Sequence, residues 1–392
     1  MTEPAFPSRS AWFPIAALAG VLGLRMLGLF LLLPVLALHA RAFPDATPFL
    51  AGLALGIYGL TQALLQVPFG TLSDRIGRRR VIVIGLGIFA VGSVVAATAH
   101  SVWVVILGRA LQGGGAISSA ATAFAADLVP EARRTRAMAV LGIAIGASFT
   151  LAILIGPPLA GWLGVAGLFW STAGLAGLAI IVVLVALPAG QAAARGAGSD
   201  ASGIEAGVAA LPRSLWPVLG GVFLIHALIT AVFVVVPGLL VDAAGLAVGD
   251  HWRVYLSALI GGLVVLTAPL VLWRERGAAG GAAQQVAFVA IAVGLGLLCA
   301  GDHRAATMTL ALLLFFGGFN FLEADFPATI AGAVASASRG RAMGVYATLQ
   351  FIGAFCGGAL GGALLGAVGP RALLGVAATL AAGACFGLRR QA

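Results

Sequence analysis

The sequence predicts an all-α polytopic membrane protein, with twelve transmembrane helices in two pseudo-equivalent six-helix bundles. Of the 392 residues, 61% are hydrophobic and 9% are charged, whereas soluble domains are about 45–50% apolar and about 25% charged. Apolar runs of about 20 residues recur along the chain, and each can cross a hydrocarbon core of about 30 Å as a helix. The chain also has similar features in its two halves. A water-soluble globule is excluded because too few polar residues exist to cover it.

Charged residues, prolines and glycines separate the apolar runs and so place the spans. The first six spans are expected at 14–38, 47–69, 81–99, 102–125, 137–161 and 164–187, which makes 1–187 the N-terminal bundle. The first run is too long for a typical signal peptide core and is expected to be retained. Residues 188–213 are rich in Ala, Gly and Ser and predict a cytoplasmic linker. The other six spans are expected at 214–239, 251–273, 284–301, 304–330, 342–366 and 370–388, within a C-terminal bundle of 214–392.

The distribution of arginine predicts the orientation in the membrane, since loops on the cytoplasmic side carry the excess of basic residues. The opposite side would hold only Arg41, Arg253, Arg304 and Arg371. The cytoplasmic side would hold Arg9, Arg75, Arg78, Arg79, Arg80, Arg133, Arg134, Arg136, Arg195, Arg213, Arg274, Arg276, Arg339, Arg341, Arg389 and Arg390. Both termini are therefore expected in the cytoplasm, in the inner membrane of a bacterium.

Composition also excludes several functions. All 22 basic residues are arginines, so the chain lacks the lysine of a Walker A loop and any Schiff-base lysine. Nucleic-acid binding is not expected, because the arginines lie in short loops and form no extended basic face. The cysteines (Cys299, Cys356 and Cys385) and the five histidines show no ligand spacing, so we expect no metal site and no cofactor.

The loop between the second and third spans combines glycine, aspartate and arginine, as Gly70-Thr71-Leu72-Ser73-Asp74-Arg75-Ile76-Gly77-Arg78-Arg79-Arg80. It resembles the loop signature of the major facilitator superfamily, G-x-L-x-D-R-x-G-R-R/K. Gly70 and Gly77 permit close helix approach and a tight turn. Asp74 can lie against the dipole of a helix N-terminus. A merely positive loop would need neither the aspartate nor the glycines.

The resemblance implies that this loop is a conformational latch formed by Gly70, Asp74, Arg75, Gly77, Arg78 and Asp127. Asp127, at the end of the fourth span, is the expected partner of Arg78, and a solvated helix-end charge is the alternative. We expect Asp74 to meet the start of the eleventh span, residues 341–344, when the cavity opens outward.

The fourth span contains Arg109-Ala110-Leu111-Gln112-Gly113, which resembles the superfamily's second motif, R-x-x-Q-G. An arginine inside a membrane span is costly and faces a cavity or a partner. The alternative is that Arg109 reaches the interface near Trp103.

The fifth span is rich in glycine and proline and is similar to the motif of the family's antiporters. We expect a hinge there, formed by Gly146, Gly156, Pro157 and Gly161. Gly156 and Gly161 recur at an offset of 205 residues as Gly361 and Gly366, and Arg136-Ala137-Met138 recurs as Arg341-Ala342-Met343. This repetition is the sign of two related bundles.

Further motifs resemble the YajR-type subgroup of drug:proton antiporter-like transporters. They are Arg25-Met26-Leu27-Gly28, Leu33-Pro34-Val35-Leu36, Asn320-Phe321-Leu322-Glu323-Ala324, Arg341-Ala342-Met343-Gly344-Val345-Tyr346 and Gln350-Phe351. The resemblance implies the major facilitator fold. Some of these relatives carry a soluble C-terminal domain, and none is expected here because Ala392 follows the last span.

Two intramembrane ionisable residues are candidates for proton coupling. Arg25 and Glu323 lie at similar depths in the first and tenth spans, so we expect them to face one another across a central cavity. A carboxylate at this depth is costly when charged and unpaired, so it forms a pair or becomes protonated. The alternatives are a fixed structural pair or a hydrated Glu323. Asp325, nearer the cytoplasm, is expected to be solvated.

Polar residues one helical turn apart mark faces that can line the cavity or join helices. Besides Asn320, they are Tyr58, Gln62 and Gln66 in the second span, His226 and Thr230 in the seventh, and Tyr346 and Gln350 in the eleventh.

The predicted function is secondary active transport, as proton-coupled efflux of small amphipathic compounds by alternating access. The proton gradient would supply the energy, and the partners would be a small-molecule substrate, protons and the lipid bilayer, with the protein acting as a monomer. The alternative is transport of a defined metabolite such as a sugar or an organic acid. A membrane receptor or enzyme is the remote alternative, and no H-E-x-x-H sequence favours it.

Overall fold

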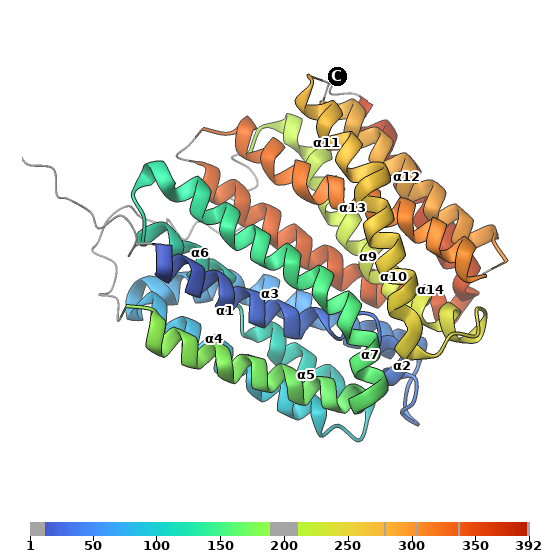
Figure 1. The fold of residues 1–392 in the computed structure, drawn as a ribbon, viewed down its shortest axis with the longest axis horizontal. Helices are drawn as coiled ribbons and strands as arrows, with labels where there is room; N and C mark the ends of the chain where they lie inside the picture. Colours follow the sequence, from blue (N-terminus) through green and yellow to red (C-terminus); the bar gives the residue numbers. More distant parts are fainter. Residues whose placement is uncertain (1–11, 189–210, 278–279, 303, 336–337, 390–392) are drawn as a thin grey trace, which may run out of the picture.

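The computed structural model describes residues 12–188, 211–277, 280–302, 304–335 and 338–389. These residues form helices joined by short turns, and none of them lies in a β-strand. Figure 1 shows the helices as two groups, the N-terminal one in blue to green and the C-terminal one in yellow-green to red. Most of the linker predicted at 188–213 and the ends of the chain lie outside the described residues.

The N-terminal group holds six membrane spans. Its helices are α1 (Trp12–Phe30), α2 (Leu36–Ala40), α3 (Pro48–Ile76), α4 (Arg78–Ala97), α5 (Val102–Gly114), α6 (Ser118–Asp127) and α7 (Glu131–Ala186). Gly164, with a φ of 67°, interrupts α7. The chain reverses direction there, so α7 crosses the bundle twice (Figure 1).

The C-terminal group is built in the same way. Its elements are η1 (Arg213–Leu215), α9 (Trp216–Asp242), η2 (Val248–Asp250), α10 (His251–Gly262), η3 (Leu263–Thr267), α11 (Ala268–Glu275), α12 (Gly280–Ala300), α13 (Ala305–Ala333) and α14 (Arg339–Arg389). Gly369, with a φ of 80°, divides α14 as Gly164 divides α7. Only glycine adopts such a φ at low cost, which explains why the two reversals fall at glycines.

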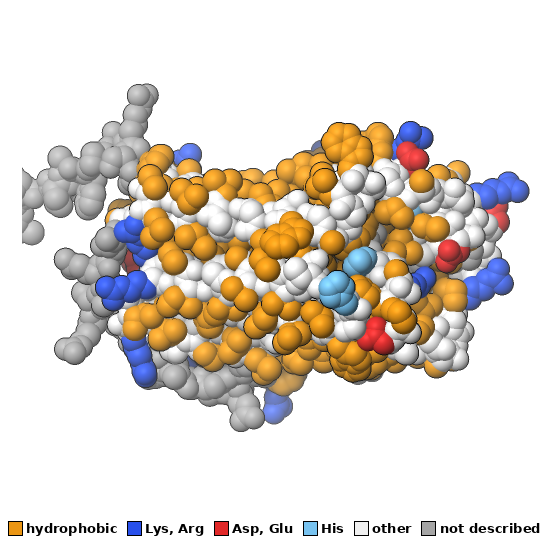
Figure 2. Space-filling model, turned by 90° about the horizontal axis from the view of Figure 1, so that it is seen from below, with side chains coloured by type: hydrophobic (Ala, Val, Ile, Leu, Met, Phe, Trp, Pro, Cys, Tyr) orange, Lys and Arg blue, Asp and Glu red, His pale blue; other side chains and the backbone are white. Residues whose placement is uncertain are grey.

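The prediction of twelve spans is confirmed. Nine helical stretches of the described residues are long and apolar enough to cross a membrane. Two of them, α7 and α14, hold two spans each, and α5 together with α6 forms one more. The middle of the surface in Figure 2 is covered by hydrophobic side chains and the charged ones gather at the two ends, as a bilayer requires.

Two expected spans are broken rather than continuous. The first, expected at 14–38, ends at Phe30 and resumes at Leu36, around Pro34, which has no backbone N–H to continue the helix. The fourth, expected at 102–125, is interrupted between Gly114 and Ser118. Hydropathy does not detect such breaks, because the intervening residues are equally apolar.

Glycines set how closely the helices approach. A Cβ atom on either Gly92 of α4 or Gly108 of α5 would lie 2.6 Å from the carbonyl oxygen of the other. Only glycine allows these two backbones to meet at that distance.

The two bundles meet at one end of the molecule. A Cβ atom on Gly358 would lie 2.5 Å from the carbonyl oxygen of Gly52, and one on Gly362 would lie 2.5 Å from that of Pro48. On the neighbouring side, a Cβ on Gly161 would lie 3.4 Å from the Cα of Gly249. We call this the closed end. Because α3 runs from Pro48 to Ile76, the turn at Gly77 lies at the opposite end, which we call the loop end.

Candidate functional site

A polar cluster lies inside the C-terminal bundle, around Glu323 of α13. Its Oε1 accepts hydrogen bonds from the hydroxyl of Tyr346 (3.2 Å) and the amide nitrogen of Gln350 (2.8 Å), both on α14. Its Oε2 lies 3.4 Å from Nε2 of His226, on α9. The Glu323 side chain is 37% exposed, while its Oε2 atom is buried. Three helices therefore contribute to one acidic site midway along a membrane span.

His226 is oriented by the backbone of its own helix. Its Nδ1 lies 2.8 Å from the carbonyl oxygen of Val222 and donates to it, because a carbonyl oxygen can only accept. In the neutral ring, Nε2 is then an acceptor for the amide nitrogen of Gln350, 3.1 Å away. When the ring is protonated, Nε2 becomes a donor that faces the carboxylate of Glu323. The imidazole can thus be an acceptor or a donor toward this cluster without movement of its helix.

Aromatic rings lie next to this cluster and cross to the other bundle. Phe319, one turn before Glu323, lies with its ring centroid 5.9 Å from that of His226 and 6.3 Å from that of Phe149 on α7. Phe149 in turn contacts Phe30 of α1, edge to face at 5.2 Å. The acidic site is therefore bordered by a row of aromatic rings that joins the two bundles.

Arg25 does not take the place expected for it. It is 0% exposed, its Nη2 donates to Oε1 of Gln62 at 2.9 Å, and its guanidinium carbon lies 5.4 Å from the ring centroid of Phe89. These contacts all lie within the N-terminal bundle, and in the described part of the chain no ion pair joins Arg25 to Glu323. The two residues share a depth, but Arg25 points into its own bundle.

Arg109 is buried as well, so the alternative that it reaches the interface is wrong. It is 0% exposed, and its Nη1 donates to Oε1 of Gln112 at 2.7 Å. Its other nitrogens donate to the carbonyl oxygens of Ala54 and Leu55 on α3. Its guanidinium carbon lies 4.6 Å from the ring centroid of Tyr58. These contacts tie α5 to α3.

The rest of this motif joins the same helices. Gln112 donates to the hydroxyl of Ser93 on α4 at 2.8 Å, and a Cβ on Gly113 would overlap the backbone of Tyr58. Gln62 reaches the hydroxyl of Ser118 at 3.4 Å. Tyr58 and Gln62 are buried, so of the two roles open to them, contact between helices is the one the structure shows.

At the loop end, Arg78 connects three elements. It forms ion pairs with Asp74 on α3 and with Asp127 on α6, the latter at 3.2 Å, and donates to the hydroxyl of Ser73 at 2.6 Å. Gly77 between α3 and α4 has a φ of 99°. Arg75 is exposed and Gly70 approaches Ser119. The expected pair of Arg78 and Asp127 is thus present in the structure.

The expected hinge residues occupy different surroundings. A Cβ on Gly156 would lie 2.7 Å from the carbonyl oxygen of Leu31, beside Pro157 in α7, and Gly161 approaches Gly249. Gly146 has open space around it. Asn320 is half-buried on α13.

The expectation that Asp325 is solvated is wrong. Its side chain is 9% exposed and lies 3.2 Å from Nε of Arg274 on α11. It also accepts from the amide nitrogen of Gln284 on α12 (2.6 Å) and the hydroxyl of Thr329 (3.1 Å). Sequence reasoning missed Arg274 and Gln284 as partners, because the only signal was an arginine and a glutamine on either side of a loop.

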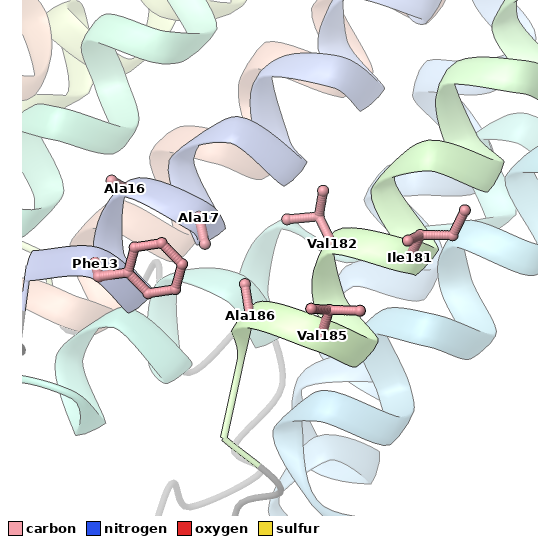
Figure 3. Close-up of a pocket in the computed structure, with 7 residues that line it drawn as sticks. All are labelled: Phe13, Ala16, Ala17, Ile181, Val182, Val185 and Ala186. Atoms are coloured by element: carbon pink, nitrogen blue, oxygen red, sulfur yellow. The ribbon is translucent and has the colours of Figure 1, made fainter.

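A hollow of about 400 Å³ lies on the outer surface of the N-terminal bundle (Figure 3). Only apolar side chains line it, from the start of α1 and the end of α7: Phe13, Ala16, Ala17, Ile181, Val182, Val185 and Ala186. The hollow lies on the surface that would contact lipid, and it has no polar group to orient a ligand. Among the described residues, no cluster of three His, Cys, Asp or Glu side chains could hold a metal.

Two six-span bundles that meet at one end, with a carboxylate midway along a span, define a membrane transporter. Residues 18–322 match the Major Facilitator Superfamily, and the chain belongs to this family. It is a non-enzymatic, multi-pass membrane protein.

Relatives and solved structures agree with this assignment. The chain is 40% identical to the inner membrane transport protein YajR of Escherichia coli (strain K12) over 358 residues, which cover 90% of this chain and 77% of YajR. It is 33% identical to the class E tetracycline resistance protein of Escherichia coli over 170 residues, 43% of this chain and 42% of that protein. The crystal structure of the nucleoside transporter NupG superposes with a TM-score of 0.76 over 96% of this chain and 98% of NupG, at 14% identity, which shows a shared fold.

Proposed function

We propose that the protein exports small amphipathic compounds in exchange for protons, by alternating access, and that Glu323 binds the coupled proton. The observation that carries the proposal is the position of Glu323, midway along α13 and in contact with His226, Tyr346 and Gln350. An intramembrane carboxylate must be paired or protonated. A neighbouring imidazole that can be a donor or an acceptor makes both states accessible.

The bundle arrangement supports alternating access. The bundles are in contact at the closed end, through glycines that fit against backbone. Such contacts form or separate as rigid bodies move, so they can serve as a gate. With the arginine-rich loop end in the cytoplasm, this conformation is open toward the cytoplasm. A single chain contains both bundles, which supports a monomer as the working unit.

The lining supports an amphipathic cargo. Phe30, Phe149 and Phe319 offer aromatic surface beside a single carboxylate and a few polar groups. Apolar pockets with few polar groups favour ligands of the same character. Tetracycline resistance proteins are relatives over less than half of the chain, so tetracycline is a reasonable first probe.

Transport by purified protein in proteoliposomes tests the proposal, with tetracycline and ethidium as probes. A pH gradient should drive accumulation of a probe by the natural protein. Glu323→Gln should abolish this accumulation but leave exchange of the probe across the membrane measurable. The amide keeps the shape of the carboxylate, but it cannot bind and release a proton. Glu275→Gln, which changes an exposed carboxylate at the end of α11, is the matched control and should transport normally. Full pH-driven transport by Glu323→Gln would show that Glu323 is a structural group.

A further inference from the structure

A second titratable group lies at the closed end, under the contact between the bundles. His251 is the first residue of α10 and follows η2 directly. Gly249 of η2 is the residue that Gly161 of α7 approaches from the other bundle. The position of His251 is therefore coupled to the position of a segment that takes part in closure.

His251 is buried, and no side chain forms a hydrogen bond with its ring. The residue is 0% exposed, and neither Nδ1 nor Nε2 of its ring has a side-chain partner; the backbone of Leu246 is the nearest polar group. Tyr255, one turn further along α10, is also 0% exposed, and its hydroxyl has no partner either. The two rings are edge to face with centroids 6.3 Å apart, and the ring centroid of Phe233 lies 6.0 Å from that of Tyr255. Buried polar groups are nearly always paired, so this imidazole and phenol form an unusual polar site in apolar surroundings.

Few charges surround this site. The carboxylate of Asp250 and the carbonyl group of Leu246 lie close to the imidazole, and Asp250 is already paired with Arg253 at 3.2 Å at the surface. Of the elements packed against α10 and η2, α7 has no ionisable residue from 137 to 186, α13 has none from 305 to 322, and η3 has none. The ionisable residues of α9 are His226, near the middle of the helix, and Asp242, exposed at its end.

Burial disfavours a proton on His251, and the nearby carboxylate of Asp250 and backbone of Leu246 offset this effect only in part. The proton would place a positive charge in a dry site, at a helix N-terminus where the backbone dipole already disfavours cations. Separation of η2 from α7 would admit water and solvate the charge. Because a ligand shifts an equilibrium toward the state that binds it better, protons must favour the open form of this end.

We propose that His251, with Tyr255 beside it, is a proton-binding site whose occupation releases the contact between η2 and α7 and so opens the closed end. This site lies at the closed end, whereas Glu323 lies midway along its span. Their roles also differ: Glu323 would carry the transported proton, and His251 would set which end of the molecule is open. The inference does not require that Glu323 couples transport.

Distance measurement between spin labels tests this proposal on the full chain. Labels attached at Ala166→Cys and Ala247→Cys, both exposed and on opposite sides of the contact, report its separation. The three natural cysteines are first replaced by serine. Between about pH 8 and about pH 5.5, which spans the titration of histidine, the long-distance population should rise about fivefold or more. His251→Gln should make the distances independent of pH.

Controls separate this site from other pH effects. His100→Gln makes the same change at an exposed histidine, in the turn after α4 at the closed end, and should keep the full response. His251→Phe keeps a ring that cannot be protonated and should match His251→Gln, with thermal unfolding to check that both variants fold.

Two results would overturn the proposal: no pH response in the natural protein, or an unchanged response in both His251 variants. Glu323→Gln should also keep the response. If it loses the response instead, the opening belongs to Glu323 and the role of His251 is wrong. If the natural protein shows no pH-driven transport but its label distances still change with pH, the proposed function is wrong and this inference still holds.

Discussion

The rings of Phe149 of the N-terminal bundle and Phe319 of the C-terminal bundle are neighbours, with ring centroids 6.3 Å apart and planes inclined by 31°. Glu323 lies one turn further along α13 from Phe319. The aromatic pair therefore borders the acidic site on the side of α13 that leads back to Ala305, its first residue. A hydrophobic layer at this position limits the passage of water and protons.

Loss of this aromatic contact should make the protein leak protons. Phe149→Ala removes one ring of the pair and leaves a gap beside Phe319 that water can enter. We expect proteoliposomes with this variant to lose an imposed pH gradient severalfold faster than those with the natural protein, as measured by an internal pH-sensitive dye. Phe13→Ala, at a residue that is 64% exposed on the outer surface, should behave like the natural protein. Equal rates for the two variants would rule out the barrier role.

A methyl group at the closed end should shift the conformational equilibrium. In Gly52→Ala the new Cβ overlaps the carbonyl oxygen of Gly358, which is backbone and cannot move aside. Overpacking of this kind costs about 1–3 kcal/mol, or about 5- to 150-fold in the equilibrium between the two states. Labelling of cysteines near Pro48 and Gly366 should become faster in this variant. Gly174→Ala, where the Cβ meets open space, should leave the labelling rate unchanged.

The buried ion pair of Asp325 should contribute to stability. Asp325→Asn removes the charge that Arg274 faces at 3.2 Å, and Arg274 is itself 39% exposed. Partial exposure reduces the loss below the 3–5 kcal/mol of a fully buried pair, so we expect about 1–3 kcal/mol. Thermal unfolding in detergent measures it. Asp302→Asn breaks the surface pair with Arg304 and should not change the unfolding temperature measurably.

Substitution of Asp74 in the latch at the loop end should shift the conformational equilibrium in the opposite direction to Gly52→Ala. Asp74→Asn removes the carboxylate that we expect at the start of the eleventh span in the outward-facing state, and so destabilises that state. The variant should remain more often in the conformation described here, with the closed end shut. Labelling near Pro48 and Gly366 should slow. Glu131→Gln, an exposed carboxylate at the same end, is the control. Unchanged labelling of cysteines at both ends would show that Asp74 has no latch role.

The predicted pair of Arg78 and Asp127 is present although 49 residues separate the two along the chain. Two contacts that were not predicted join residues close in sequence. Asp74 and Arg78 are four residues apart, on either side of the turn at Gly77, and form an ion pair. Arg109 and Gln112 are on one face of α5 and form a hydrogen bond. The spans were placed correctly because membrane insertion depends on the hydropathy of each segment by itself. The same reasoning failed for Asp325, since burial near the end of a span depends on what the neighbouring helices bring to it.

The sequence by itself determined the class of protein, the number of spans and the residues able to hold a charge inside the membrane. It could not decide which of these residues meet, because that depends on the rotation of each helix about its axis and on close contacts between distant segments. Arg25 and Glu323 share a depth, yet the packing of α1 turns Arg25 toward Gln62. The packing of α9 against α14 instead brings His226 to Gln350, 124 residues away, and so to Glu323. Glycines that admit one backbone against another set these positions, and their partners exist only in the folded protein.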